Sequence, residues 1–261
     1  MPTTWILLRG LVREQAHWHG FADRLASALG TGHHVVCIDL PGNGLRYRDR
    51  SPTRIAAMVD AAREDLARQG VDGPINLVAL SLGGMVTMEW LRRYPQEVAA
   101  AALINSSAAP VSPFWQRLKP ANCGAIVRHG LLGHDRLKRE RRILDITTNR
   151  LSDVDKDRIA REFRRIDEAR PVSTANTLRQ LWAAARFRAP SALPAGRPLL
   201  VINAATDRLV DPRCSAALAK RWSTRRAVHP DGGHDLSLDD PAWLADTLAA
   251  WALNKFAAFG D

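Results

Sequence analysis

The chain has 261 residues, of which 46% are hydrophobic and 25% are charged. This length suits one α/β domain with an excursion rather than two equal domains, and this composition excludes long disordered tracts. The formal net charge is +10, but Arg and Lys are mixed with Asp and Glu, and no basic stretch is interleaved with aromatic side chains. We therefore expect no nucleic-acid partner.

The N-terminal stretch and the cysteines predict the cellular compartment. Met1 leads into the apolar segment TWILL without a basic leader or a cleavage site, and no run of about 18 apolar residues follows anywhere. Cys37, Cys123 and Cys214 are odd in number and widely spaced, which favours a reducing compartment over a disulfide framework. Cys37 lies in an apolar run and is expected to be a small buried hydrophobe. We expect a cytoplasmic protein without stable membrane insertion.

Short apolar runs alternate with amphipathic segments along the chain. Buried strands are predicted at residues 4–9, 34–39, 75–80, 98–104 and 198–203, with a weaker sixth strand at 225–229. Helices are expected at residues 18–29, 53–69, 82–93, 212–221 and 241–256, where Asp211 and Asp240 each precede a proline as an N-cap does. The alternation predicts an α/β fold with about six parallel strands, wound on both faces by helices through right-handed crossovers.

Residues 112–194 break this alternation. They contain no convincing strand, but they show helical periodicity over three stretches and prolines mark the ends of these stretches. A structureless loop of this length is implausible in a compact domain. We therefore expect a helical lid inserted between the core segments 1–111 and 195–261, over the carboxyl ends of the strands. Its dense mixed charge indicates either solvated helix faces or a basic mouth for anionic or lipid-interface substrates.

Three residues with catalytic potential follow predicted strands. Ser81 follows strand 75–80 in the stretch VALSLGG, Asp207 follows strand 198–203, and His234 follows the sixth strand. The carboxyl ends of parallel strands meet at one edge of a sheet, so we expect the three side chains to lie close together. We expect Ser81 to be a nucleophile, His234 its base and Asp207 the acid that orients the base.

The bend at Ser81 matches the nucleophile elbow G-x-S-x-G except that Ala79 replaces the first glycine. Alanine is the least costly departure, since it adds a single methyl group, and Gly83 keeps the other side open. The alternative interpretation is a helix cap in a nucleotide-binding turn. The G-x-G-x-x-G spacing that such a turn requires is absent.

Taken together, these motifs resemble the α/β-hydrolase superfamily, in particular its lidded esterase-like members. The resemblance covers nearly the whole chain and rests on the first strand with its oxyanion loop, DLPGNG at 39–44, the elbow at 79–83, the inserted lid, the acid loop and the GGH loop. It implies an α/β-hydrolase fold that lacks the usual N-terminal antiparallel hairpin. It also implies an oxyanion hole formed by the backbone N–H groups of Leu82 and Leu11.

Some residues depart from the family pattern or compete for its roles. Where related proteins carry His-Gly, this chain has Arg9-Gly10, and Arg9 is expected either to pair with Glu14 or Asp39 as a clamp or to anchor a substrate anion. Asp211 is expected to cap a helix, and Asp231 and Asp235 flank His234 too closely to orient it. Asn105 stands where some family members place the acid. His229 is expected to be structural.

The resemblance implies hydrolysis of an ester or related carbonyl compound, as in carboxylesterases and thioesterases, with a small-molecule substrate and without a cofactor. A carbon–carbon bond hydrolase, a cofactor-free perhydrolase and a non-catalytic ligand-binding protein are the alternatives. No metal is expected, because His17, His19, His33 and His34 lack acid or thiol partners at ligand spacing. The candidate pocket residues are Trp18, Ser106, Ser107, Trp115, Trp182 and Leu209.

Overall fold

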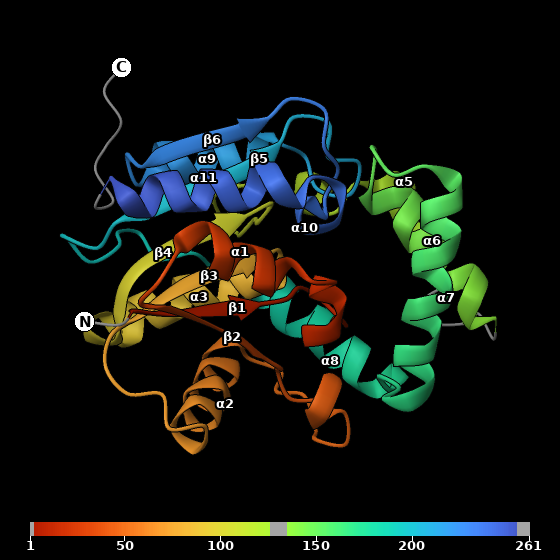
Figure 1. The fold of residues 1–261 in the computed structure, drawn as a ribbon, viewed down its shortest axis with the longest axis horizontal. Coiled ribbons are helices and arrows are strands. Elements are labelled where there is room, and N and C mark those ends of the chain that lie inside the picture. Colours follow the sequence, from red (N-terminus) through yellow and green to blue (C-terminus); the bar gives the residue numbers. More distant parts are fainter. Residues whose placement is uncertain (1–2, 126–134, 255–261) are drawn as a thin grey trace.

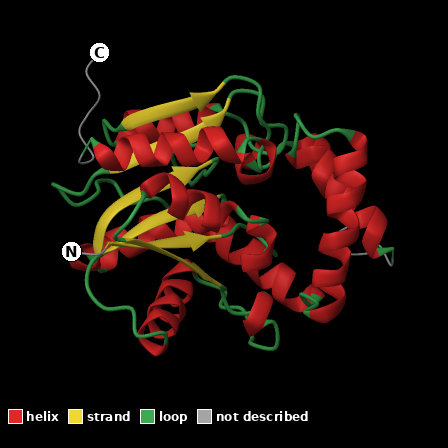
Figure 2. Cartoon of the chain, in the orientation of Figure 1, coloured by secondary structure: helices red, strands yellow, loops and turns green. Residues whose placement is uncertain are grey.

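The computed structural model of the chain describes residues 3–125 and 135–254, and it places the six predicted strands in one parallel sheet (Figure 1). The strands are β1 (Thr3–Leu8), β2 (His33–Ile38), β3 (Ile75–Leu80), β4 (Val98–Ile104), β5 (Leu199–Ala204) and β6 (Arg225–His229). Their order in the sheet is β2-β1-β3-β4-β5-β6. The predicted α/β class with six parallel strands is confirmed, and Figure 2 shows the helices around the sheet.

The prediction that residues 34–39 form a strand buried on both faces is wrong. β2 pairs only with β1 and is an edge of the sheet, so only Ile38 of its six residues is buried. β3 lies between two strands, and all six of its residues are buried. Cys37 on β2 is consequently half-buried against the core, and burial raises the pKa of its thiol to about 12.

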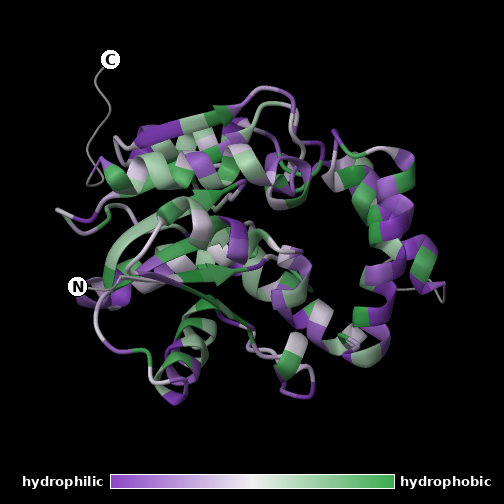
Figure 3. Ribbon diagram, viewed as in Figure 1, coloured by the Kyte–Doolittle hydropathy of each residue, from purple (hydrophilic) through white to green (hydrophobic). Residues whose placement is uncertain are grey.

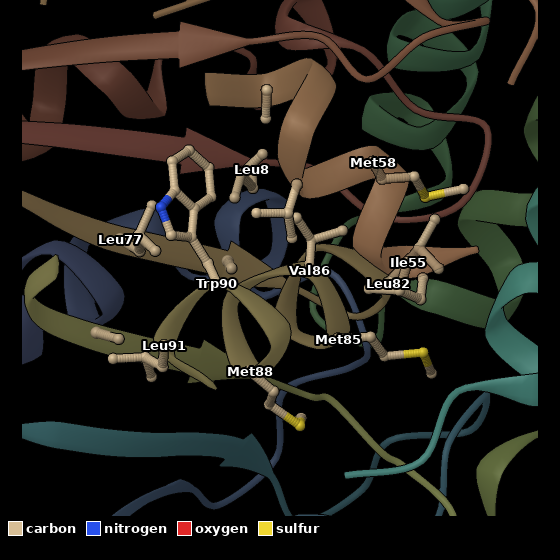
Figure 4. Close-up of a cluster of buried hydrophobic side chains, with 14 of the residues drawn as sticks. Leu8, Ile55, Met58, Leu77, Leu82, Met85, Val86, Met88, Trp90 and Leu91 are labelled. Carbon is tan, nitrogen blue, oxygen red and sulfur yellow. The ribbon is translucent and has the colours of Figure 1, made fainter. Parts of the chain in front are cut away.

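Helices cover both faces of the sheet and enclose two apolar cores. On one face lie α1 (Phe21–Leu29) and α11 (Pro241–Leu253); on the other lie α2 (Ile55–Arg68), α3 (Leu82–Arg93) and α9 (Arg213–Arg221). Figure 4 shows Val86 and Trp90 of α3 directed toward Leu8 and Leu77 of the sheet. Burial of each large apolar side chain stabilises the folded state by about 1.5–3 kcal/mol. The packed sheet therefore holds the loops at its carboxyl edge in fixed positions.

Among the described residues, five helices lie between β4 and β5. They are α4 (Phe114–Arg117), α5 (Pro120–Ala125), α6 (Arg136–Thr147), α7 (Asp153–Ala169) and α8 (Thr174–Arg186). The side chains of Asp135, Ser152 and Ser173 cap α6, α7 and α8 by accepting backbone N–H groups. In Figure 1, α6 and α7 stand beyond the arrowheads of the strands, and Figure 3 shows many hydrophilic residues on them.

The inserted helices have a small core of their own and are attached to the loops of the sheet. Leu144 of α6 and Phe163 of α7 pack together with Leu238 of the short helix α10 (Leu236–Asp239). After α6, the backbone N–H groups of Asn149 and Arg150 donate to the carboxylate of Asp239 at 2.8–3.0 Å. The insertion is therefore fixed beside the chain segment that follows β6. Residues 126–134 of the expected lid lie outside the described residues.

Within the described ranges, no helix combines the length and the apolar character that crossing a membrane requires.

Candidate active site

Ser81 occupies a strained turn between β3 and α3. Its backbone has φ 57° and ψ −113°, a region that residues other than glycine rarely adopt. The turn is held on both sides, since the Ser81 N–H donates to the carbonyl of Ile104 at 2.9 Å and its carbonyl accepts the Ser106 hydroxyl at 2.8 Å. This conformation presents the Ser81 side chain beyond the carboxyl end of β3.

Close backbone contacts explain the small residues around Ser81. A Cβ atom on Gly83 would lie 2.6 Å from the carbonyl oxygen of Leu8, and one on Gly10 would lie 3.1 Å from the Cβ of Ser81. Gly83 therefore cannot carry a side chain without displacing β1. Ala79 is different, because its methyl group is fully buried in the apolar core and packs there without a special backbone conformation.

Asp207 and His234 form a buried acid–base pair on neighbouring loops. His234 Nδ1 lies 2.7 Å from Asp207 Oδ2, and the two residues are 4% and 2% exposed. The other carboxylate oxygen, Oδ1, accepts the N–H groups of Leu209 at 2.8 Å and Val210 at 3.0 Å. Since the carboxylate engages Nδ1, the proton lies on Nδ1 and Nε2 is the ring nitrogen that can accept a proton.

The competing acids have other partners. Asp211 binds the guanidinium of Arg213, and Asp231 binds that of Arg150. Asp211 also accepts the backbone N–H of Arg213, the first residue of α9, at 2.9 Å, but the N-cap of α9 is Pro212, so the expected N-cap position of Asp211 is wrong by one residue. These contacts leave Asp207 as the carboxylate paired with His234.

Two further residues hold the loop that carries His234. Asn105 follows β4 in the left-handed region, with φ 46°; its amide nitrogen donates to the carbonyl of His234 at 2.7 Å, and its amide oxygen accepts the Ala204 N–H at 2.9 Å. His229 accepts the Gly232 N–H on Nδ1 at 2.8 Å, and its Nε2 lies 3.2 Å from Asp240. His229 thus has structural partners, and Asn105 holds the backbone of His234 where some family members place a carboxylate.

Ser81 and His234 line one cavity of about 190 Å³ at the carboxyl edge of the sheet. Its apolar wall includes Leu11 and Leu209 from the core loops. The inserted helices contribute Ile143, Ile146 and Ile166. The cavity therefore lies between the sheet edge and the insertion, with the serine and the histidine in its wall.

Two backbone N–H groups near Ser81 are available as donors. Leu82 is the first residue of α3, so its N–H has no acceptor within the helix. The Leu11 N–H has no hydrogen-bond acceptor among residues 3–125 and 135–254, and Leu11 lines the cavity next to Gly10. The next residue, Val12, is held in the left-handed region at φ 51° by donating its N–H to Gln180 Oε1 at 3.0 Å.

The expectation that Arg9 pairs with Glu14 or Asp39 is wrong. The Arg9 guanidinium donates instead to both carboxylate oxygens of Asp235, at 3.1 and 2.5 Å, and to the hydroxyl of Ser237 at 3.0 Å. Burial alone would raise the pKa of Asp235, but the charge and hydrogen bonds of Arg9 outweigh it and hold that pKa below its usual value. Glu14 binds Arg170 instead. The Asp39 carboxylate accepts the backbone N–H groups of Gln15 at 2.8 Å and Leu45 at 3.0 Å.

Of the expected pocket residues, Leu209 lines the cavity and the others do not. Trp18 is 1% exposed and stacks on Phe21 inside the core beneath α1. Trp115 and Trp182 are 62% and 55% exposed on the inserted helices. Ser106 and Ser107 are buried, and Ser106 supports the elbow through the carbonyl of Ser81. These residue types are common both in cores and on surfaces, so sequence position alone misplaced them.

Gln180 is a supporting residue that the sequence analysis missed. It is fully buried on α8, accepts the Val12 N–H, and donates to Asn43 Oδ1 at 2.8 Å and to the Ser51 hydroxyl at 3.1 Å. Asn43 in turn donates to the carbonyl of Arg13 at 3.0 Å. The signal was a pair of amide residues, Asn176 and Gln180, one turn apart on the buried face of a helix.

The charged residues of the cavity wall are largely paired. Arg13 binds Glu140, and Arg170 binds Glu14. Each of these ion pairs joins two separate segments of the chain. Arg142, also in the wall, is exposed to solvent. Within the described ranges, no three His, Cys, Asp or Glu side chains gather in a way that could hold a metal ion.

Comparisons with known proteins show the family to which the chain belongs. The family model described as "Alpha/beta hydrolase family" matches residues 6–247. A pimeloyl-(acyl-carrier protein) methyl ester esterase of Chromobacterium violaceum is 34% identical over 88 residues, which are 34% of this chain and 32% of that protein. The biotin biosynthesis bifunctional protein BioHC of Teredinibacter turnerae is 32% identical over 93 residues, which are 36% of this chain and 15% of that protein.

The alignments with these curated relatives thus span a third or less of their own lengths. Among solved structures, a serine hydrolase from the polyaromatic-hydrocarbon-degrading bacterium Cycloclasticus zankles superposes with a TM-score of 0.77 at 17% identity. The superposition covers 98% of this chain and 92% of that one. At this identity the likeness establishes the fold.

Proposed function

Because the chain belongs to the alpha/beta hydrolase family, we propose that it is a serine hydrolase that cleaves a carboxylic ester or thioester through a covalent acyl-enzyme on Ser81. The observation that carries the proposal is the buried hydrogen bond between His234 and Asp207, beside a cavity that His234 shares with Ser81. A serine needs such a base to become nucleophilic at neutral pH.

In the first half-reaction, the Ser81 oxygen attacks the substrate carbonyl carbon while His234 Nε2 takes the hydroxyl proton. Asp207 holds the ring in the required tautomer and stabilises the imidazolium that forms. The N–H groups of Leu82 and Leu11 receive the negative charge that develops on the carbonyl oxygen. His234 then returns its proton to the leaving alcohol or thiol, and the acyl group stays on Ser81.

In the second half-reaction, water replaces the leaving group. His234 removes a proton from the water as it attacks the acyl carbon, and the same two N–H groups stabilise the second tetrahedral intermediate. Collapse returns the proton to Ser81 and releases the carboxylic acid. No step requires a cofactor, because the chain supplies the nucleophile, base and oxyanion donors itself.

The inserted helices act, in this proposal, as a lid over the core segments 1–111 and 195–261. Their isoleucines form part of the cavity wall, which favours an apolar acyl group, and so their position decides which acyl groups fit. One curated relative is named as a methyl ester esterase. Small-molecule methyl esters therefore belong in the substrate panel.

Labelling with a fluorophosphonate tests the nucleophile. The wild type is expected to gain one covalent adduct, seen by intact-protein mass spectrometry, and Ser81→Ala is expected to gain none. Ser27→Ala, which removes an exposed hydroxyl from α1, is the matched control and should label as the wild type does. An adduct that persists in Ser81→Ala would remove Ser81 from the mechanism.

Turnover then tests the substrate class. Methyl, p-nitrophenyl and thioester substrates of increasing acyl length should be hydrolysed by the wild type and not by Ser81→Ala. A carbon–carbon bond hydrolase would instead favour a β-diketone over every ester by a wide margin. That result would keep the triad and overturn the ester assignment.

A further inference from the structure

His17 is a buried histidine in the wall of the cavity that the proposed reaction does not use. It lies in the short 3-10 helix η1 (Gln15–Trp18), in the loop that follows β1 and carries Leu11. The residue is 4% exposed and lines the cavity together with Ser81 and His234. It therefore borders the space in which a substrate would bind.

The tautomer of His17 is set by its neighbour Glu14. The backbone N–H of Glu14 donates to His17 Nδ1 at 3.1 Å, so Nδ1 carries no proton. Burial, followed by the positive charges of Arg13 and Arg9, lowers the pKa of His17 well below its usual value, and the ring is neutral at pH 7. In a neutral imidazole with a bare Nδ1, Nε2 carries the hydrogen and is a donor.

This donor has no partner. His17 Nε2 is buried and makes no hydrogen bond to any of the described residues. A buried polar group without a partner costs about 1–3 kcal/mol, so its retention calls for a reason. Phe163 contacts the ring at a centroid distance of 4.5 Å and helps to fix its orientation. An acceptor atom of a bound ligand would satisfy the Nε2–H once the ligand displaces the atoms that cover Nε2.

The charges around His17 favour its neutral form. After burial, the positive charges of Arg13, Arg9 and Arg170 each lower the pKa of His17, so the ring stays uncharged and Nε2 is a neutral donor. All three guanidiniums are engaged by carboxylates, in Glu140, Asp235 and Glu14, and are held in place. Because their hydrogen bonds go to these carboxylates, the guanidiniums are not free to bind the ligand directly. The Nε2–H of His17 is then the directional contact.

We propose that His17 is a specificity-determining residue, whose Nε2–H donates a hydrogen bond to a second oxygen in the acyl group of the substrate, a ketone or a carboxylate. The enzyme would thereby favour oxygenated acyl groups over plain hydrocarbon ones of the same length. This inference rests on the proposed ester hydrolysis. The acyl group is the portion of the substrate that stays in the cavity through both half-reactions, so a fixed donor acts on it throughout.

Pairs of p-nitrophenyl esters that differ by one oxygen function test the proposal. The probes are the pentanoate with the 4-oxopentanoate, the hexanoate with the 5-oxohexanoate, and the heptanoate with the half-ester of adipic acid. Each kcat/KM is divided by the rate of uncatalysed hydrolysis at the same pH, which removes the intrinsic reactivity of the ester. At one or more lengths the wild type should favour the oxygenated member by about 5- to 10-fold, the worth of one hydrogen bond.

Variants assign this preference to His17. His17→Phe should bring the normalised ratio close to one, whereas His17→Gln, which keeps an acceptor for the Glu14 N–H and a donor for the substrate, should restore part of it. His34→Phe is the matched control, since His34 is exposed on β2 away from the cavity, and it should keep the wild-type ratio. An equal preference in the wild type and in His17→Phe would overturn the proposal.

A measurement on the unaltered protein covers the case in which His17→Phe does not fold. Long-range ¹H–¹⁵N spectra of histidine-labelled wild type should show His17 with its proton on Nε2, and the Nε2 resonance should shift on addition of the uncharged 4-oxopentanamide but not of pentanamide. No shift with either amide, or the same shift with both, would contradict the proposal. Failure of the ester hydrolysis itself is recognised separately, by absence of fluorophosphonate labelling and of alkanoate turnover.

Discussion

Arg9 and Asp235 form a buried two-point ion pair that joins the loop after β1 to the loop bearing His234. The two side chains are 226 positions apart in the chain and almost fully excluded from solvent. The guanidinium is also held by the Ser237 hydroxyl and lies 4.8 Å from the ring centroid of Trp18. Because Leu11 and His234 each lie one or two residues from this pair, the pair fixes the proposed oxyanion donor relative to the proposed base.

Removing one charge of the Arg9–Asp235 pair should lower the free energy of unfolding far more than replacing both residues with apolar ones. Arg9→Met leaves the Asp235 carboxylate buried without its partner, and we expect a loss of about 3–5 kcal/mol in the free energy of unfolding. The double variant Arg9→Met with Asp235→Leu removes both charges and should regain most of that loss. Urea unfolding of the two single variants and the double variant measures this. Purely additive losses would show that the two charges do not depend on each other.

Asp207 should matter for turnover more than for folding. Asp207→Asn keeps the shape of the side chain but favours the wrong tautomer of His234, and kcat for an ester should fall about 10³- to 10⁴-fold. Asp211→Asn is the matched control four positions away, since Asp211 binds Arg213 and not His234. Its kcat should stay within a few-fold of wild type. Near-normal turnover by Asp207→Asn would assign the orienting acid to another residue.

The parts of the site that follow strands were predictable, because a parallel sheet brings the carboxyl ends of its strands to one edge. Ser81, Asp207 and His234 each lie just beyond a strand whose apolar run is plain in the sequence, and the structure places the latter two in contact. Their roles stay predictions until labelling and turnover are measured.

Contacts between distant loops were not predictable in the same way. Arg9 has several carboxylates within a few positions, and only the packing of the loops selects Asp235 over Glu14 and Asp39. An aromatic residue such as Trp115 does not reveal whether its face of a helix meets a cavity or solvent. The apolar run of β2 likewise gives no sign that the strand lies at the edge of the sheet.

The two small positions flanking Ser81 should respond differently to substitution. Gly83→Ala would place a methyl group within 3 Å of the carbonyl oxygens of Leu8 and Arg9, so β1 and the loop that follows it must shift. We expect a loss of about 1–3 kcal/mol in the free energy of unfolding. Ala79→Gly restores the residue of the elbow pattern and deletes one buried methyl group, at a cost of about 1 kcal/mol. Urea unfolding ranks the two, and a smaller loss for Gly83→Ala would contradict the close contact.

His17 should make the stability of the protein depend on pH. Unfolded, His17 takes up a proton near pH 6.5, whereas burial and then Arg13 and Arg9 hold its pKa in the folded protein well below that. The unfolded state therefore binds more protons below pH 6.5, and the contribution of His17 to stability is complete above that pH and is lost as the pH falls toward the folded-state pKa.

The loss should approach about 1.4 kcal/mol for each pH unit in that window. Urea unfolding at pH 7.5, 6.5 and 5.5 measures it in the wild type and in His17→Phe, which lacks the titrating ring but keeps the other histidines. The stability difference between the two proteins should move in favour of the variant as the pH falls. A difference that stays constant over this range would mean that His17 is protonated as readily in the folded chain as in the unfolded one. The neutral Nε2–H donor proposed for the cavity would then not exist at the lower pH.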